Sequence, residues 1–229
     1  MEKYTDGVYG YQPHSMKRIS LLLLLSLFLL QLACTTGDAS APPDRKATGA
    51  GIQYERIKKH ALAARLFCQQ NGLDRKLCIL ADMQVHSGKN RMVVWDFTKD
   101  TVIASGLVSH GCSDNPWGKD KSKEEPVFSN TFDSHCSSLG KYKLGERGYS
   151  SWGIHVKYLM HGLEPTNSNA LKREIVLHGW DAIADHEVYP DGTPEGWGCP
   201  AVSNAFMKKL DELLQTRKKP VLLLSLIHI

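Results

Sequence analysis

Two Gly-Cys pairs in the sequence could each present a thiol to a substrate. The first closes "VSHGC" (108–112), in which a histidine stands two residues before the cysteine. The second lies in "GWGCPAVS" (196–203). A nucleophilic cysteine needs a lowered pKa, backbone N–H groups aimed at the oxyanion, and a base within reach. A site with these features would carry out acyl transfer through a covalent thioester.

The second stretch offers the first two of these features. Gly196 and Gly198 stand on either side of Trp197 and let the backbone approach a substrate carbonyl closely. A helix is expected to begin shortly after Cys199, and its positive end would favour a thiolate. Pro200 has no N–H, so the amides of Gly198 and Cys199 are the predicted oxyanion donors.

The predicted base is His178, which ends the strand-like run within "REIVLHGW" (173–180). A histidine changes its charge near neutral pH and can take the proton of a thiol. Alone, a histidine at a strand end would more often be structural. The cysteine that follows the loop 179–195 favours a catalytic pair instead. Asp181 would either orient His178 or cap a turn, and both readings stay open.

Hydrophobic periodicity predicts that a mainly β domain positions these residues. The polar stretch 113–136 is expected to be a loop. Strands are predicted over 77–85, 91–97 and 101–109, within 139–162, and over 173–180.

Two helices are expected to flank the strands. The first spans 52–70 and ends at Asn71-Gly72. Its apolar face carries Ile57, Ala61, Ala64 and Cys68. The second helix starts at Ser203, whose side chain can act as the N-cap. Its apolar positions are Ala205, Phe206, Leu210, Leu213 and Leu214.

The N-terminal region has the pattern of an export signal. In "MKRISLLLLLSLFLLQLAC" (16–34), Lys17-Arg18 precede an apolar run that ends at Ala33-Cys34. The run is shorter than the about 20 residues that span a membrane, and it has the order of a secretory signal. A small residue followed by cysteine predicts a lipoprotein that is lipidated at Cys34 and so attached to a membrane. Plain secretion is the alternative, and both predict a protein of the periplasm or cell envelope.

The remaining boundaries follow from this signal and from composition. Residues 1–15 are interpreted as an over-read, a stretch upstream of the true start at Met16. The polar, Pro-containing segment 35–50 is interpreted as a linker. The N-terminal helix is assigned to 51–74 and the main domain to 75–223. The last residues, 224–229, are interpreted as a non-native tail.

Composition and motif spacing argue against several other classes of protein. The net charge of +4, without a long basic run, gives no case for a nucleic-acid partner. No CxxC or HExxH spacing occurs near the candidate residues, so no metal site is predicted. No cofactor is expected either.

Taken together, "REIVLHGW" and "GWGCPAV" resemble the catalytic signature of the murein L,D-transpeptidases (YkuD-like), in the subfamily whose motif ends Trp-Gly-Cys-Pro-Ala-Val. "SNTFDSHCSSLGKYKLGE" (129–146) and "HGLEP" (161–165) are similar to other segments of that subfamily. The resemblance covers roughly 75–223 and implies an L,D-transpeptidase-like β-sandwich with a few flanking helices. It also implies acyl transfer between peptidoglycan tetrapeptide stems, with Cys199 as the nucleophile.

The chain departs from the general family pattern at two positions. Trp197 stands where a histidine usually lies two residues before the nucleophile, and Gly196 replaces a serine or threonine. His178 therefore inherits the role of base by elimination, with His135 as a second candidate. Two alternatives stay open: a carboxypeptidase or crosslink hydrolase on the same site, and a non-catalytic lipoprotein that binds the wall.

Five residues are candidates for binding substrate. His135, Ser137 and Ser138 belong to the segment 129–146, in which "SSLGKY" (137–142) takes the place of the Thr-Pro-x-Gly-x-Phe loop of the wider family. Trp197 would either stack on substrate or brace the nucleophile loop. Arg173 would either bind a substrate carboxylate or stay solvated.

The "VSHGC" stretch imitates the nucleophile motif of the general family but is not interpreted as that motif. It precedes the strand that ends in His-Gly, whereas in this family the nucleophile motif follows that strand. Cys112 in that stretch and Cys136 in the later loop stand at positions where the subfamily has other residues. This resemblance suggests a Cys112–Cys136 disulfide in an oxidising envelope. Cys68 and Cys78 flank a Gly-containing turn and are predicted to form a second disulfide. The alternative for all four is a buried free thiol.

Overall fold

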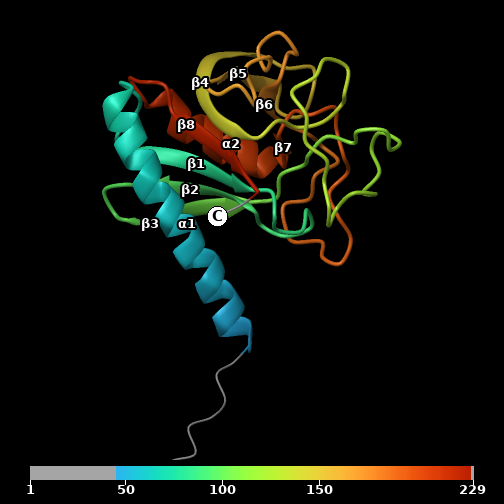
Figure 1. Ribbon diagram of the computed structural model, residues 1–229, viewed down its shortest axis with the longest axis horizontal. Helices are drawn as coiled ribbons and strands as arrows, with labels where there is room; N and C mark the ends of the chain where they lie inside the picture. The colour runs from blue at the N-terminus through green and yellow to red at the C-terminus, as the bar shows by residue number, and fades with distance from the viewer. Residues whose placement is uncertain (1–44, 228–229) are drawn as a thin grey trace, which may run out of the picture. The chain divides into compact units, whose positions relative to one another are not determined.

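Eight strands pair into one sheet in the computed structural model of the protein, which describes residues 45–227 (Figure 1). The order across the sheet is β3-β2-β1-β8-β4-β5-β6-β7. Neighbours pair antiparallel except β1 with β8 and β6 with β7, which are parallel. In chain order the elements are α1 (Arg45–Gln70), β1 (Leu77–Asp82), β2 (Met92–Asp96), β3 (Thr101–Gly106), β4 (Gly140–Tyr149), β5 (Val156–Gly162), β6 (Val176–Gly179), β7 (Ala201–Val202), α2 (Asn204–Gln215) and β8 (Leu222–Leu226).

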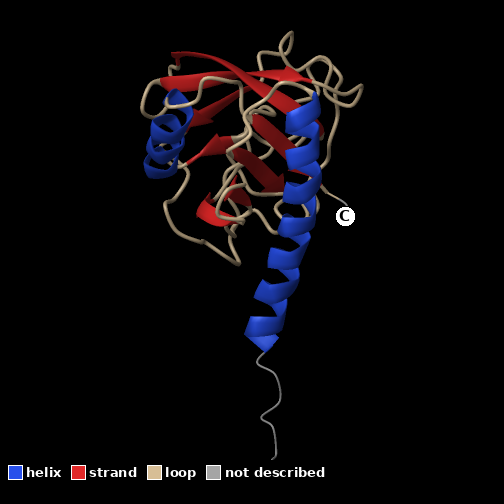
Figure 2. Cartoon of the chain, turned by 90° about the vertical axis from the view of Figure 1, so that its left-hand side faces the viewer, coloured by secondary structure: helices blue, strands red, loops and turns tan. Residues whose placement is uncertain are grey.

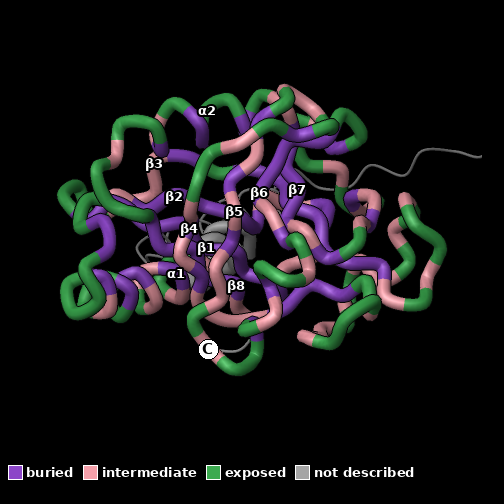
Figure 3. Tube along the Cα trace, turned by 90° about the horizontal axis from the view of Figure 1, so that it is seen from above, coloured by how far each residue is buried: buried purple, intermediate pink, exposed green. Residues whose placement is uncertain are grey.

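The centre of the sheet is buried on both faces. Alternate residues of a strand point to opposite faces, and β1 shows this directly. Leu77, Ile79 and Ala81 belong to the main core, to which α2 also contributes. Cys78 and Leu80 belong to a second cluster, which α1 covers. Figure 3 shows the buried part of the trace concentrated in the strands, with exposed loops around it.

Helix α1 packs against the sheet through the face that its periodicity predicts (Figure 2). It ends as predicted: Gly72 has a φ of +69°, and the N–H of Leu73 donates to the carbonyl of Cys68, which is a Schellman cap. The helix begins at Arg45, so it includes residues 45–50 of the predicted linker. The residues on its buried face are Ile57, Ala61, Ala64 and Cys68.

Helix α2 begins where the sequence predicts. Oγ of Ser203 accepts a hydrogen bond from the N–H of Phe206 at 3.2 Å, which satisfies one of the free amides of the first turn. Ala205, expected to be apolar and inward, is exposed instead, and Leu213 is only partly buried. The residues that α2 buries are Phe206, Met207, Leu210, Asp211 and Leu214.

A buried carboxylate ties α2 to the sheet. Asp211 accepts two hydrogen bonds from the Arg147 guanidinium of β4, at 2.8 and 3.0 Å. It also accepts one from the hydroxyl of Tyr158 of β5, at 2.6 Å. The bidentate geometry holds the helix over the strands that lead to β6.

Strand β8 lies in the middle of the sheet, between β1 and β4. Its residues Leu224–Leu226 belong to the segment 224–229 that was predicted to be a non-native tail. Leu224, Ser225 and Leu226 pair with Leu80–Asp82 of β1. The origin of these residues stays a prediction, but in this structure they complete the central strand.

The prediction of a mainly β fold with flanking helices is confirmed. The strands form a single sheet that nearly closes into a barrel around the main core. The predicted over-read (1–15), signal (16–34) and lipidation site (Cys34) lie outside the described residues. No helix in the part of the chain that the structure describes is long and apolar enough to cross a membrane.

Replacing Ser203 with alanine should lower the free energy of unfolding by about 1 kcal/mol, because the first turn of α2 loses its cap. Urea denaturation followed by circular dichroism measures this change. Ser203→Thr is the matched control, because a threonine hydroxyl can accept the same hydrogen bond. An alanine variant as stable as the threonine variant would contradict the capping role.

Candidate active site

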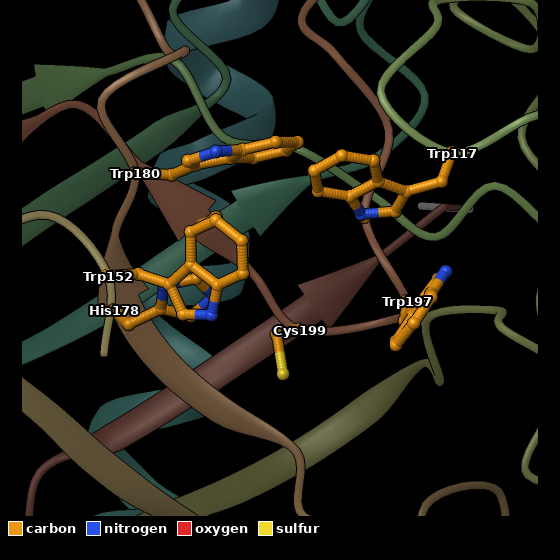
Figure 4. Close-up of a pocket in the computed structure, with 8 residues that line it drawn as sticks. Trp117, Trp152, His178, Trp180, Trp197 and Cys199 are labelled. Carbon is orange, nitrogen blue, oxygen red and sulfur yellow. The ribbon is translucent and has the colours of Figure 1, made fainter. Parts of the chain in front are cut away.

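The two residues predicted to react lie in one pocket. Cys199 and His178 both line one pocket (Figure 4). The cause is the parallel pairing of β6 with β7, in which His178 is in register with Ala201. The N–H of His178 also approaches the carbonyl of Pro200, at 3.5 Å. The chain that enters β7 therefore passes Cys199 alongside Val176, at the start of β6.

The Cys199 thiol is a neutral group at rest. Its sulfur accepts a hydrogen bond from the N–H of Val176 at 3.4 Å and donates to the carbonyl of Glu174 at 3.7 Å. Burial raises the pKa of the thiol, and this outweighs the lowering by the Val176 amide and by the charge of Arg173. A thiolate favoured by the positive end of α2 was expected, and the raised pKa contradicts that expectation.

His178 is a neutral imidazole with one nitrogen free to accept a proton. Nδ1 lies 2.8 Å from the carbonyl oxygen of Gly179, which can only accept, so Nδ1 carries the hydrogen. Burial lowers the pKa of His178, so the neutral form prevails and Nε2 keeps its lone pair. The carbonyl of Gly179, and not Asp181, orients this ring, and the Asp181 carboxylate accepts a hydrogen bond from Asn204 at 2.7 Å.

The backbone before Cys199 is held in a conformation that requires glycine. Gly198 has a φ of +100°, and a Cβ there would lie 2.4 Å from the carbonyl oxygen of Cys136. The carbonyl of Gly198 accepts a hydrogen bond from Oγ of Ser137 at 3.0 Å. The amides of Gly198 and Cys199 donate to no acceptor among the described residues, so both are free to bind an oxyanion.

Arg173 holds the loop that supports Gly198. Nη1 donates to the carbonyl of Ser129 at 3.0 Å and to Oγ of Ser138 at 2.9 Å. Nη2 donates to the carbonyl of Cys136 at 2.6 Å, the same oxygen that limits space at Gly198. The guanidinium is thus engaged with its own chain, and Ser137 and Ser138 hold the loop with it. Substrate contacts by these three residues stay a prediction.

His135 does not line the pocket that holds Cys199, although Trp197 lines both that pocket and the groove of His135. Its ring stacks on Trp197, with centroids 5.3 Å apart and planes 22° apart. It lines a separate groove together with Lys172 and Glu174, whereas His178 lines the pocket with the cysteine. The structure therefore brings only His178, of the two candidate bases, into the pocket of Cys199.

The "VSHGC" stretch packs against the loop that precedes Cys199, and its own side chains are buried. Gly111 bridges Gly196, and the N–H of Cys112 donates to the carbonyl of Gly196 at 2.8 Å. The His110 side chain is fully buried, and burial lowers its pKa to about 3, with Arg91 adding to the effect. Cys112 is buried too, and burial raises the pKa of its thiol.

A series of buried hydrogen bonds that starts from His110 of "VSHGC" includes Glu195, which the sequence analysis did not identify. Arg91 donates to Nδ1 of His110 at 2.8 Å, so Nε2 carries the hydrogen and donates to Oγ of Ser122 at 3.0 Å. That hydroxyl donates to the carboxylate of Glu195 at 3.0 Å. Glu195 immediately precedes the nucleophile loop. Its only signal in the sequence is an acidic residue beside the "GWGC" motif.

The two predicted disulfides are not formed in the structure. Cys68, Cys78, Cys112 and Cys136 are all buried free thiols. Each predicted pair is nevertheless close enough for one thiol to influence the pKa of the other. Burial raises the pKa of Cys78 far above its ordinary value, which suits a thiol that packs as a small apolar residue.

Three tryptophans in the pocket were also missed by the sequence analysis. Trp117, Trp152 and Trp180 line it together with Trp197. Trp180 follows the His-Gly pair directly, but Trp117 and Trp152 stand in loops with no motif that marks them. No cluster of potential metal ligands occurs among the described residues.

The fold and the site define a class of protein: a mainly β domain that presents a cysteine and a histidine in one pocket at the edge of its sheet. The family of L,D-transpeptidase catalytic domains matches residues 49–222, about three quarters of the chain. The chain therefore belongs to the L,D-transpeptidase catalytic domain family. The matched segment begins inside α1.

Two solved structures illustrate the similarity. The helical cell shape determining protein Pgp2 from Campylobacter jejuni is 13% identical with a TM-score of 0.43, over 67% of this chain and 48% of that chain. An L,D-transpeptidase from Xylanimonas cellulosilytica is 13% identical with a TM-score of 0.37, over 67% of this chain and 63% of that one. The chain spans about half the length of the Campylobacter protein. No curated protein sequence matches it.

Gly198→Ala should destabilise the protein by about 2 kcal/mol or more, because the new Cβ would lie 2.4 Å from the Cys136 carbonyl at a φ of +100°. Gly196→Ala is the matched control, because a Cβ there meets no atom within 4 Å. This control should lower the free energy of unfolding by less than about 0.5 kcal/mol. Urea denaturation of both variants gives the comparison. Equal losses would argue against a close approach at Gly198.

Cys199 should react slowly with iodoacetamide at pH 7 and faster as the pH rises past the ordinary thiol pKa of 9.0. The reason is that the thiolate is the reactive form and burial moves its formation to higher pH. Mass spectrometry of the Cys199 peptide over a pH series measures the rate, with a free cysteine peptide as control. A rate that has already reached its plateau at pH 7 would indicate a thiolate–imidazolium pair instead.

Proposed function

We propose that the protein is a cysteine-dependent L,D-transpeptidase of peptidoglycan, with Cys199 as the nucleophile and His178 as the general base. One observation carries the proposal: the β6–β7 register brings a neutral imidazole and a neutral thiol into one pocket, beside two unengaged amides. Membership of the L,D-transpeptidase catalytic domain family supports the same class of reaction.

The first half-reaction forms a thioester. Nε2 of His178 takes the thiol proton as Sγ of Cys199 attacks the carbonyl carbon of the diamino acid in a tetrapeptide stem. The amides of Gly198 and Cys199 bind the oxyanion of the tetrahedral intermediate. The C–N bond then breaks, His178 returns the proton to the leaving amine, and the terminal D-alanine departs.

The second half-reaction decides the product. An amine from a neighbouring stem attacks the thioester and forms a crosslink, and Cys199 regains its proton. If water attacks instead, the same residues make a carboxypeptidase or a crosslink hydrolase. The departure at Trp197 is the feature that favours a third candidate, a non-catalytic wall-binding lipoprotein. His178 supplies an imidazole in the same pocket, so transfer is the function we put first.

The proposed location agrees with this substrate. Export to the periplasm or cell envelope, with a lipid anchor at Cys34, would hold the domain next to peptidoglycan stem peptides. Neither nucleic acid nor a cofactor enters the proposed reaction. Each step uses a thiol, an imidazole or a backbone amide of this chain.

The proposal predicts that a carbapenem forms a covalent adduct with the protein and that Cys199→Ala abolishes it. Cys112→Ala is the matched control and should keep the adduct, because that thiol is buried under the nucleophile loop. His178→Ala should slow acylation at pH 7 by about a hundredfold, because the thiol loses its base. Intact-protein mass spectrometry measures all three.

The muropeptides released after incubation with purified sacculi show which half-reaction prevails. Dimers joined through the diamino acid indicate transfer, and tripeptides alone indicate hydrolysis. An adduct that survives Cys199→Ala and disappears in Cys112→Ala would overturn the choice of nucleophile.

A further inference from the structure

Glu195 is an acidic residue that is fully buried and stands three residues before Gly198. Removing a carboxylate from water is costly unless hydrogen bonds and an opposite charge compensate for the lost hydration. A neutral side chain at this position would avoid that cost. The contacts of the Glu195 carboxylate therefore indicate what it does there.

Four hydrogen bonds join Glu195 to a single loop, residues 117–123, here called the Trp117 loop. Oε1 of Glu195 accepts from the N–H of Ser122 at 2.5 Å and from its hydroxyl at 3.0 Å. The backbone N–H of Glu195 donates to the carbonyl of Lys119 at 2.7 Å, and its carbonyl accepts from the N–H of Gly118 at 2.9 Å. Both the side chain and the backbone of one residue thus hold this loop.

The Trp117 loop forms one side of the pocket that contains Cys199. Trp117 lines that pocket, and its ring stacks on Trp180 with centroids 5.3 Å apart. The opposite side includes Trp197, whose ring centroid lies 6.5 Å from that of Trp117. Trp197 follows Glu195 by two residues. The hydrogen bonds of Glu195 therefore connect two sides of the same pocket.

A buried cation compensates for the charge of the Glu195 carboxylate. Arg91 is fully buried and donates to Nδ1 of His110 at 2.8 Å. Nε2 of His110 donates to Oγ of Ser122 at 3.0 Å, and that hydroxyl donates to Glu195. Every bond in the series runs from the cation toward the carboxylate, and in this arrangement each bond strengthens the next. Ser122 is the link through which the series reaches Glu195.

The residue after Glu195 is held from a second side. The N–H of Gly196 donates to the carbonyl of His110 at 2.8 Å. Residues 195 and 196 are thus fixed between the Trp117 loop and the "VSHGC" stretch. The amides of Gly198 and Cys199, which donate to no acceptor among the described residues, follow within three or four residues of Glu195. Their position depends on where this part of the chain is held.

We propose that Glu195 is a positioning residue, which ties the Trp117 loop to residues 195–198 and so holds the amides of Gly198 and Cys199 where the oxyanion forms. Glu195 does not line the pocket, so it acts through the backbone and not on the substrate. Donors fixed in advance stabilise an oxyanion best, and small displacements of them lower the rate. The effect on acylation rests on the transpeptidase function proposed above, whereas the tie between the two loops does not.

Hydrogen exchange of the full-length protein tests the tie without any reaction. Ser122→Val and Ser122→Thr have side chains of nearly the same shape, and only threonine keeps the hydroxyl that joins His110 to Glu195. Mass spectrometry should show amides of 117–123 and 195–199 exchanging at least fivefold faster in the valine variant than in the threonine variant. Amides of residues 53–70 in α1 should exchange alike in both. Equal exchange in 117–123 and 195–199 would overturn the proposal.

Glu195→Gln tests the charge in the same experiment. Glutamine has the length of glutamate and can still accept from Ser122, but it carries no charge to compensate for Arg91. Exchange in 117–123 and 195–199 should be faster than in the parent protein. A glutamine variant that exchanges like the parent would show that the carboxylate charge does not support the tie.

The rate of acylation by a carbapenem tests the effect on catalysis. Intact-protein mass spectrometry over a series of carbapenem concentrations gives the maximum rate and the half-saturating concentration. Ser122→Val should lower the maximum rate by about tenfold and change the half-saturating concentration by less than threefold, because the oxyanion exists only after attack. Ser122→Thr should restore the rate. Ser105→Val, the same change at an exposed position of β3, should leave both values unaltered.

The outcomes separate this proposal from the proposed function. If the parent protein forms no acyl-enzyme but the valine variant exchanges faster, the transpeptidase function is overturned and the tie between the loops stands. If the parent is acylated and the valine and threonine variants react at the same rate, the positioning role of Glu195 is overturned and the transpeptidase function stands.

Discussion

The site depends on the parallel pairing between β6 and β7, which is only two residues long. This pairing sets His178 opposite Ala201 and so brings Cys199 to the same pocket. So short a pairing needs support from both sides. The N–H of Trp180 donates to the carbonyl of Val202, and the N–H of Ser109 donates to that of Ala201, both at 2.8 Å. The Ser203 cap then leads the chain directly into α2.

The loop before Cys199 is held from several directions, which prepares its amides for an oxyanion. Gly111 bridges Gly196, Ser137 binds the carbonyl of Gly198, and the Cys136 carbonyl fits against Gly198 because no side chain intervenes. Most of these contacts come from "VSHGC" and from the 129–138 loop, neither of which contains Cys199. Fixed donors are effective because they need no reorganisation when the negative charge forms.

Burial has opposite effects on the pKa values of the two candidate catalytic groups, and together these effects set the protonation states at rest. It raises the pKa of the Cys199 thiol and lowers that of the His178 imidazole, so both are neutral near pH 7. In the proposed reaction, proton transfer therefore accompanies attack on the substrate. The tryptophans that line the pocket extend the same apolar environment around Cys199.

The sequence by itself determined the features that depend on neighbours along the chain. The periodicity of 52–70, the Asn71-Gly72 ending and the Ser203 cap are local, and the structure confirms them. The pairing of Cys199 with His178 was also predicted, because two motifs in a given order mark it. Only the tertiary structure decided which histidine shares the pocket, that Arg173 is engaged by its own loop, and that four tryptophans meet. The four tryptophans stand in three loops without periodicity, with Trp180 and Trp197 both between β6 and β7. The pairing of distant strands sets the distances between these loops.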